Sequence, residues 1–252
     1  MTSDDRLEIS VDAERIRATL VSPSTRLPGV LLVHGWGGSQ QQYLARAREI
    51  ARLGRICLTF DLRGHAAGAA RQESVTREDN LRDVIAAYDD LVARRSVDAS
   101  AIAVVGSSYG AYLAAILTSL RPVKWLSLRA PALYPDEHWD RPKREVHRLV
   151  DLVALRRTLV SAESNRALNA CAAFTGDVLI VESEHDDIVP PPVITSYVRA
   201  CERAQSVTHH VLKGADHGLA QEASQRAYTT LLVNWLTEME RRRRKVPVQP
   251  EA

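Results

Sequence analysis

The sequence predicts an α/β protein, built on a mostly parallel sheet of about eight strands flanked by helices. Two patterns support this fold class. Short apolar runs without polar alternation recur along the chain, as in strands that are covered on both faces. Segments with apolar residues at helical spacing separate these runs, so that successive strands are joined by helices and pair in parallel. Because 45% of the 252 residues are hydrophobic, the chain can bury one large core, and we expect a single domain over residues 1–252.

The expected strands begin with a hairpin. Two alternating runs flank Asp12-Ala13-Glu14 and predict this hairpin, and apolar runs predict the remaining strands. The expected strands cover residues 7–11, 16–21, 30–33, 56–60, 102–105, 123–128, 178–181 and 207–212.

The expected helices lie between these strands. Gly54 is placed to end the first helix, and Thr76 with Asp79 predicts a capping box at the start of the second. The expected helices cover residues 43–51, 81–92, 111–117, 146–159, 165–174, 193–201 and 228–239.

The alternation of strands and helices breaks between residues 129 and 175. Pro131, Pro135 and Pro142 interrupt this stretch, and no strand pattern is visible in it. We therefore expect a small helical lid, inserted at approximately residues 130–175, over the edge of the sheet where the strands end.

Charge and composition argue against several classes of protein. The 33 basic residues are balanced by 31 acidic residues, and no stretch is long and apolar enough to span a membrane. Cys57, Cys171 and Cys201 are scattered, without the spacing of metal ligands, as is usual for reduced thiols. We expect a cytoplasmic protein with no bound metal and with neither nucleic acid nor membrane as a partner. A homodimer stays open.

One turn carries the strongest chemical signal. Gly106-Ser107-Ser108-Tyr109-Gly110 links an expected strand directly to an expected helix. The glycines allow so sharp a bend because they have no Cβ, and the bend lifts the Ser108 hydroxyl to the positive end of the helix. This arrangement is a nucleophile elbow. The alternative is a glycine-rich turn that holds a bystander serine.

A serine nucleophile needs a base, and the base needs a carboxylate to orient it. Asp186 and His217 each follow the end of an expected strand, and in a parallel sheet these ends meet at one edge. The order Ser108, Asp186, His217 is that of a hydrolase triad on such a sheet. The neighbouring Asp187 is the alternative acid.

Four further motifs accompany this order, and with them the chain resembles the α/β-hydrolase superfamily. The likeness is to the small bacterial esterase, dienelactone-hydrolase-like and prolyl-oligopeptidase-like branches. The motifs are His34-Gly35-Trp36-Gly37-Gly38, Asp61-Leu62-Arg63-Gly64-His65, Asp186-Asp187-Ile188-Val189-Pro190 and Asp216-His217-Gly218.

The resemblance implies roles for several residues. The backbone amides of Trp36 and Tyr109 would form the oxyanion hole, and Asp186 would be the acid, since it stands in the family's position before Val-Pro. His34 would brace the oxyanion loop. Dienelactone hydrolases proper carry cysteine where Ser108 stands, so their lactone chemistry is not expected.

The function that follows is hydrolysis of carboxylic esters of small to medium size through an acyl-serine, without a cofactor. The alternatives are a serine peptidase or amidase of the same fold, and a ligand-binding relative without activity. For the substrate site we expect Arg129, at a strand end, with Tyr134 and Trp139 from the lid. Arg129 in an internal ion pair and Trp139 in the core of the lid are the alternatives.

Overall fold

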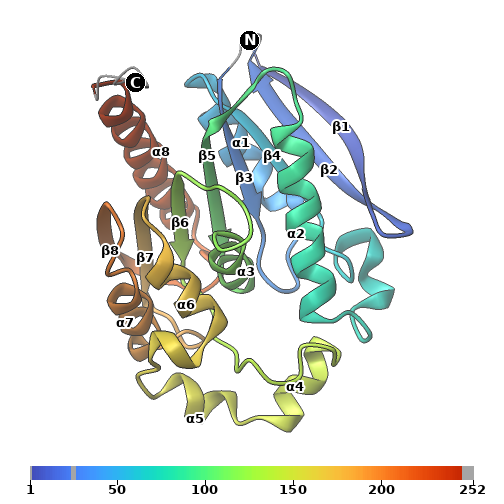
Figure 1. Cartoon of the computed structure of the whole chain (residues 1–252), viewed down its shortest axis with the longest axis vertical. Helices are drawn as coiled ribbons and strands as arrows, with labels where there is room; N and C mark the ends of the chain where they lie inside the picture. Colours follow the sequence, from blue (N-terminus) through green and yellow to red (C-terminus); the bar gives the residue numbers. More distant parts are fainter. Residues whose placement is uncertain (1, 24–26, 246–252) are drawn as a thin grey trace, which may run out of the picture.

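The sheet determines the architecture of the molecule (Figure 1). In this computed structural model, which describes residues 2–23 and 27–245, its eight strands follow the order β1-β2-β4-β3-β5-β6-β7-β8. β1 pairs with β2 and β2 with β4 in antiparallel fashion, and every pair from β4 to β8 is parallel. The predicted fold class is confirmed. The strands are β1 (Thr2–Val11), β2 (Glu14–Pro23), β3 (Leu27–Val33), β4 (Ile56–Phe60), β5 (Val97–Ser107), β6 (Trp125–Arg129), β7 (Asp177–His185) and β8 (Ser206–Asp216).

Helices cover both faces of the sheet. Buried side chains of α1 and α8 belong to one core cluster, and those of α2, α3, α6 and α7 belong to the other. The α-helices are α1 (Leu44–Arg52), α2 (Arg77–Val92), α3 (Tyr109–Leu117), α4 (Lys143–Leu149), α5 (Leu152–Arg156), α6 (Arg166–Ala173), α7 (Pro191–Ala200) and α8 (Glu222–Lys245). Short 3₁₀ helices are η1 (Gln40–Tyr43), η2 (Ala66–Arg71) and η3 (Ala162–Ser164).

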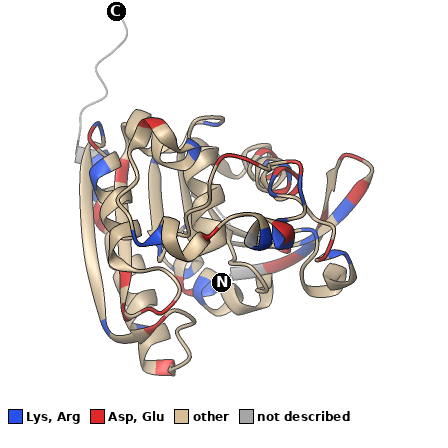
Figure 2. Ribbon diagram, turned by 90° about the horizontal axis from the view of Figure 1, so that it is seen from below, with Lys and Arg blue, Asp and Glu red and all other residues tan. Residues whose placement is uncertain are grey.

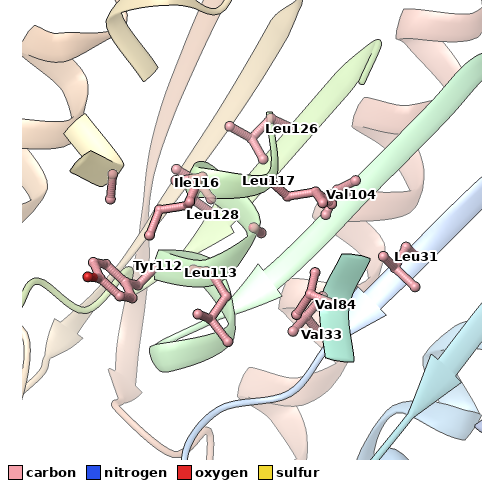
Figure 3. Packing of buried hydrophobic residues seen from close by; sticks show 14 of the residues in the cluster. Leu31, Val33, Val84, Val104, Tyr112, Leu113, Ile116, Leu117, Leu126 and Leu128 are labelled. Atoms are coloured by element: carbon pink, nitrogen blue, oxygen red, sulfur yellow. The ribbon is translucent and has the colours of Figure 1, made fainter. Parts of the chain in front are cut away.

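The central strands show why the core has two halves. In β3, Leu31 and Val33 pack in one cluster, while Val30 and Leu32 pack in the other, because successive side chains of a strand point to opposite faces. α3 is buried along its whole length. Figure 3 shows its side chains, such as Ile116, lying among those of the strands and of α2. A helix enclosed in this way fixes the strand-to-helix turn that precedes it.

The segment between β6 and β7 is helical, and its helices are shorter than expected. The predicted helix over residues 146–159 is two helices, α4 and α5, because Val150 takes an extended conformation between them. Asp151 then caps α5 by accepting a hydrogen bond from the amide of Ala154. α4 and α5 lie beyond the ends of the parallel strands, whereas α6 packs on α3 (Figure 1).

Charged residues of both signs are spread over the molecule (Figure 2). None of the helices formed by residues 2–23 and 27–245 combines the length and apolarity needed to cross a membrane. Cys57, Cys171 and Cys201 are buried, free thiols.

A buried histidine fixes the turn that follows β3. The amide of Leu62 donates to Nε2 of His34 at 3.0 Å, so the imidazole proton is on Nδ1, which lies 2.8 Å from the carbonyl oxygen of Gly35. The ring therefore ties the loop after β3 to the loop after β4, as expected of a brace. Burial lowers the pKa of His34 to about 4. The histidine is thus neutral at physiological pH.

We expect Gly110→Ala to destabilise the fold. A Cβ at Gly110 would lie 2.4 Å from the carbonyl oxygens of Val33 and His34, so backbone must move. The free energy of unfolding should fall by about 1–3 kcal/mol, measured by denaturant titration. The control is Gly68→Ala, where a Cβ meets nothing within 4 Å and the change should stay within about 0.5 kcal/mol. Equal stability of the two variants would contradict the close approach of α3 to β3.

The buried neutral His34 predicts a loss of stability in acid. An unfolded imidazole has a pKa near 6.5, so below that pH the unfolded chain binds more protons than the folded one. The His34 contribution is complete above pH 6.5 and is lost as the pH falls towards 4, at a cost of up to about 3 kcal/mol. In His34→Asn the unfolding free energy should depend less on pH between 7.5 and 4.5. The exposed control His210→Gln should keep the wild-type slope, and an unchanged slope in His34→Asn would refute the assignment.

Candidate active site

Ser108 stands at a strained turn between β5 and α3. Its backbone angles, φ 53° and ψ −118°, lie outside the regions that residues other than glycine favour. The turn is held by backbone bonds: the Ser108 amide donates to the carbonyl of Arg129 at 2.9 Å, and the Ser108 carbonyl accepts from Ala132 at 3.1 Å. A Cβ at Gly106 would lie 2.5 Å from the Cα of Ala111, so only glycine fits there. The strand-to-helix context predicted for the elbow is present.

Three side chains form a continuous hydrogen-bonded chain at this turn. Nε2 of His217 lies 3.0 Å from Oγ of Ser108. Nδ1 of the same ring lies 2.8 Å and 2.9 Å from the two carboxylate oxygens of Asp186. Because Nδ1–H donates a hydrogen bond to Asp186, Nε2 carries no proton and can accept a hydrogen bond from the serine hydroxyl. These are the three residues that the sequence placed at strand ends.

The electrostatics of Asp186 suit this arrangement. Burial opposes its ionisation, but hydrogen bonds from His217 and from the amides of Val189 and Ile188 outweigh burial, and the pKa of the carboxyl lies below its ordinary value. The side chain of Asp186 is 4% exposed. Asp187, the alternative acid, is exposed and has no polar partner among the described residues. The geometry therefore favours Asp186 as the partner of the imidazole.

Two backbone amides are available beside the serine. Among the hydrogen bonds of the described residues, none uses the amide of Trp36 or of Tyr109 as a donor. The loop that carries Trp36 passes close to the nucleophile, since a Cβ at Gly35 would lie 3.9 Å from Oγ of Ser108. Tyr109 is the first residue of α3, where an amide has no partner within the helix. Both amides can serve a developing oxyanion.

A cleft with a volume of about 360 Å³ opens at Ser108 and His217. Its walls are the loop after β3, the start of α1, the loop after β8 and the start of α8. The residues that line it are Gly35, Trp36, Gly37, Gly38, Gln42, Tyr43, Arg46, Ser107, Ser108, Arg129, His217, Gly218, Leu219 and Gln225. None of these belongs to the segment 130–175. The cleft therefore opens on the side of the sheet that α1 and α8 cover.

Arg129 lines the cleft, and its guanidinium is engaged by the protein. Nη1 donates to the carbonyl of His217 at 2.8 Å and to the hydroxyl of Ser183 at 3.4 Å, and Nε donates to the hydroxyl of Ser107 at 3.2 Å. Among the described residues no carboxylate lies within ion-pair distance of Arg129. The internal ion pair considered from the sequence is therefore absent there, and the arginine instead joins the elbow strand to the histidine loop.

Tyr134 and Trp139, expected at the substrate, lie elsewhere. Both rings pack against Tyr112 of α3, with centroids 5.1 Å and 6.2 Å away, in the core half formed by α2, α3, α6 and α7. Arg77 lies over both rings, at 5.9 Å and 4.9 Å from their centroids. The expectation failed because a strand-end position cannot tell which face of the sheet the following segment covers. Trp139 has a packing role on Tyr112 and Arg77, which is closer to the alternative of a core residue.

A buried lysine from the same segment reaches the oxyanion loop. Nζ of Lys143, at the start of α4, lies 3.9 Å from the ring centroid of Trp36 and 5.0 Å from that of Tyr109. Burial lowers the pKa of Lys143. α4 is thus anchored by a cation on the rings of Trp36 and Tyr109.

Sequence reasoning missed Arg46, which also lines the cleft. The residue is 9% exposed, and its Nε donates to the hydroxyl of Thr229 in α8 at 3.2 Å. A signal was present, because Arg46 stands three residues after Tyr43 and four before Ile50, on the apolar stripe of α1. A charged residue on a buried helix face marks a polar site.

The other candidate side chains have structural contacts. His209 pairs with Glu182 at 3.0 Å, and His210 is exposed on β8. Nδ1 of His65 lies 2.9 Å from the carbonyl of Arg63, and Arg63 binds the buried Asp83 of α2. Arg63 and His65 therefore pin the loop after β4 to α2.

The comparisons with known proteins agree with this geometry. An uncharacterized protein of Mycobacterium tuberculosis is 28% identical over 211 residues, 84% of this chain and 70% of that protein. The fold is similar to that of a dienelactone hydrolase from Anabaena variabilis, with a TM-score of 0.67, 16% identity and coverage of 94% of this chain and 98% of the other. It is also similar to an acylaminoacyl peptidase from Pyrococcus horikoshii, with a TM-score of 0.70, 12% identity and coverage of 94% and 41%. At such identities these two structures show the fold alone.

The family itself follows from the sequence match. The model of the alpha/beta hydrolase family matches residues 30–229, from β3 into α8, and this range includes the elbow, the acid loop and the histidine loop. This chain belongs to the alpha/beta hydrolase family.

Proposed function

We propose that this chain is a serine hydrolase that cleaves carboxylic esters of small to medium substrates through an acyl-serine intermediate. The hydrogen-bonded chain Asp186–His217–Ser108 at the elbow is the observation that supports it most strongly. Membership in the alpha/beta hydrolase family supports hydrolysis as the class of reaction.

The proposed mechanism has two halves. His217 takes the proton of Ser108 as the oxygen attacks the ester carbonyl, and then donates this proton to the leaving alcohol. Water, deprotonated by the same imidazole, next attacks the acyl-serine, and the imidazolium returns this proton to the oxygen of Ser108 as the acid is released. In each half the amides of Trp36 and Tyr109 would stabilise the oxyanion, and one such donor typically lowers the barrier by about 3 kcal/mol. Asp186 holds the imidazole in the required tautomer.

Arg129 acts in this proposal as a positioning residue. Its guanidinium joins Ser107, the neighbour of the nucleophile, to the backbone carbonyl of His217. These bonds set the distance between the elbow and the loop that carries the base. With Nε and Nη1 engaged in the protein, no pair of free nitrogens remains for a bidentate bond, which makes Arg129 a poor candidate for holding a substrate carboxylate.

An amidase or peptidase would use the same residues. None of the residues that line the cleft distinguishes an amide substrate from an ester substrate. A panel of p-nitrophenyl esters beside peptide p-nitroanilides separates the two activities. We expect the enzyme to turn over the p-nitrophenyl esters much faster than the peptide p-nitroanilides.

Ser108→Ala should fold and lose activity. The serine oxygen attacks the phosphorus of a fluorophosphonate probe and displaces fluoride, so the variant should lose both labelling and turnover of p-nitrophenyl esters. The expected loss in kcat is at least about 1000-fold. Ser107→Ala is the neighbouring control and should still be labelled. Labelling that persists in Ser108→Ala would overturn the assignment of Ser108 as the nucleophile.

Loss of the carboxylate should reduce kcat strongly at Asp186 and only slightly at Asp187. Asp186→Asn removes the acceptor for Nδ1 of His217, and kcat should fall by about 10⁴-fold while the fold is retained. Asp187→Asn, an exposed change of the same chemistry, should alter kcat less than about threefold. Steady-state kinetics on one ester decide between them, and the reverse ranking would show that the acid was assigned wrongly.

A further inference from the structure

The walls of the cleft carry basic residues and no acidic ones. Of the residues that line it, Arg46 and Arg129 are charged, and none is Asp or Glu. Arg129 uses Nε and Nη1 in hydrogen bonds within the protein, so it has no pair of free nitrogens for an anion. Arg46 is therefore the cation of the cleft whose guanidinium is available to bind a ligand.

Arg46 is buried without a counter-charge among the described residues. One nitrogen, Nε, donates to the neutral hydroxyl of Thr229, and the guanidinium lies over the rings of Tyr228 and Tyr43, 4.5 Å and 5.4 Å from their centroids. Ring faces attract a cation but do not neutralise it. Removing a charge from water without a partner costs free energy, so an anion bound beside Arg46 would offset that cost.

The contacts of Arg46 also leave it ready to bind. Thr229 and the two rings hold the guanidinium in one place, while its two terminal nitrogens have no hydrogen-bond partner within residues 2–23 and 27–245. A planar pair of N–H donors of this kind matches a carboxylate, which it binds by two parallel hydrogen bonds. Because the side chain is already ordered, little rotamer entropy is lost when an anion binds.

We propose that Arg46 is the specificity residue for esters that carry a carboxylate, such as hemiesters of dicarboxylic acids. The inference rests on the proposed function, since Arg46 and Ser108 line one cleft of about 360 Å³ and a single small substrate would reach both. The contact with substrate that the sequence analysis expected of Arg129 is thus assigned to Arg46.

The test compares esters that differ only in charge. Mono-4-nitrophenyl glutarate and 4-nitrophenyl pentanoate have acyl chains of equal length, and 4-acetoxybenzoate and 4-acetoxytoluene place the charge on the alcohol side instead. The wild type should cleave at least one of the charged esters with a kcat/KM about tenfold or more above that of its neutral match, as expected for a charge-assisted bond. A wild type that cleaves neutral esters and shows no such preference in either pair overturns the inference and leaves the proposed function standing.

Variants of α1 identify the residue. Arg46→Gln should reduce the preference for the charged ester to about onefold, whereas the exposed Arg52→Gln on the same helix should retain it. A preference that survives Arg46→Gln, or an equal loss for charged and neutral esters, assigns Arg46 a structural role and refutes the inference. If Arg46→Gln does not fold, Arg46→Lys replaces it. A single ammonium cannot form two parallel hydrogen bonds with a carboxylate, so the preference for the charged ester should fall. An unchanged preference would contradict bidentate binding by Arg46.

Binding without turnover separates this inference from the function. Glutarate, titrated calorimetrically, should bind the wild type and Ser108→Ala equally, and it should bind Arg46→Gln at least about tenfold more weakly. If no ester is cleaved but glutarate binds through Arg46, the proposed function fails and the anion site stands. If glutarate does not bind, the anion site fails whatever the activity.

Discussion

The backbone approach between α3 and β3 is the constraint on which this structure depends. At Gly110 the helix lies so close to the carbonyl oxygens of Val33 and His34 that no Cβ fits, and at Gly106 the strand lies equally close to α3. The contact brings the start of the helix, with the Tyr109 amide, beside the loop that carries the Trp36 amide. The strained φ of Ser108 is maintained because the strand and the helix on either side are buried in the core. One packing contact therefore sets both the position of Ser108 and the backbone amides that lie around it.

Side chains then connect this centre to the outer loops. His34 ties the loop after β3 to the loop after β4, and Arg129 ties the end of β6 to the histidine loop beyond β8. Each tie uses a buried polar group whose partners are backbone carbonyls, amides or hydroxyls. Such bonds depend on fixed geometry, because a displaced partner leaves a buried donor unsatisfied. The loops around the nucleophile are thus held by groups that take no part in the chemistry.

The sequence predicted the parallel sheet and the strand ends well, because buried strands have a distinct apolar pattern. Ser108, Asp186 and His217 were placed by the same reasoning, since parallel strands bring their ends to one edge, and the structure joins them by hydrogen bonds. The cleft walls were not predictable in this way. Tyr134 and Trp139 follow a strand end as the triad residues do, but the chain turns to the other face of the sheet there. The packing of α6 on α3 decides which face of the sheet the chain covers. This contact joins segments that are far apart in sequence, so a local pattern does not predict it.

The walls of the cleft have a consequence for the order in which the protein becomes functional. α8, the last helix to be synthesised among the described elements, contributes Gln225 to the cleft and Thr229 to the anchoring of Arg46. A growing chain that has just passed His217 already contains all three members of the hydrogen-bonded chain, yet one wall is still missing. Under the proposed function, recognition of a charged substrate therefore requires that α1 and α8, on the same face of the sheet, meet. During translation, the cleft is therefore complete only when α8 has left the ribosome and packed.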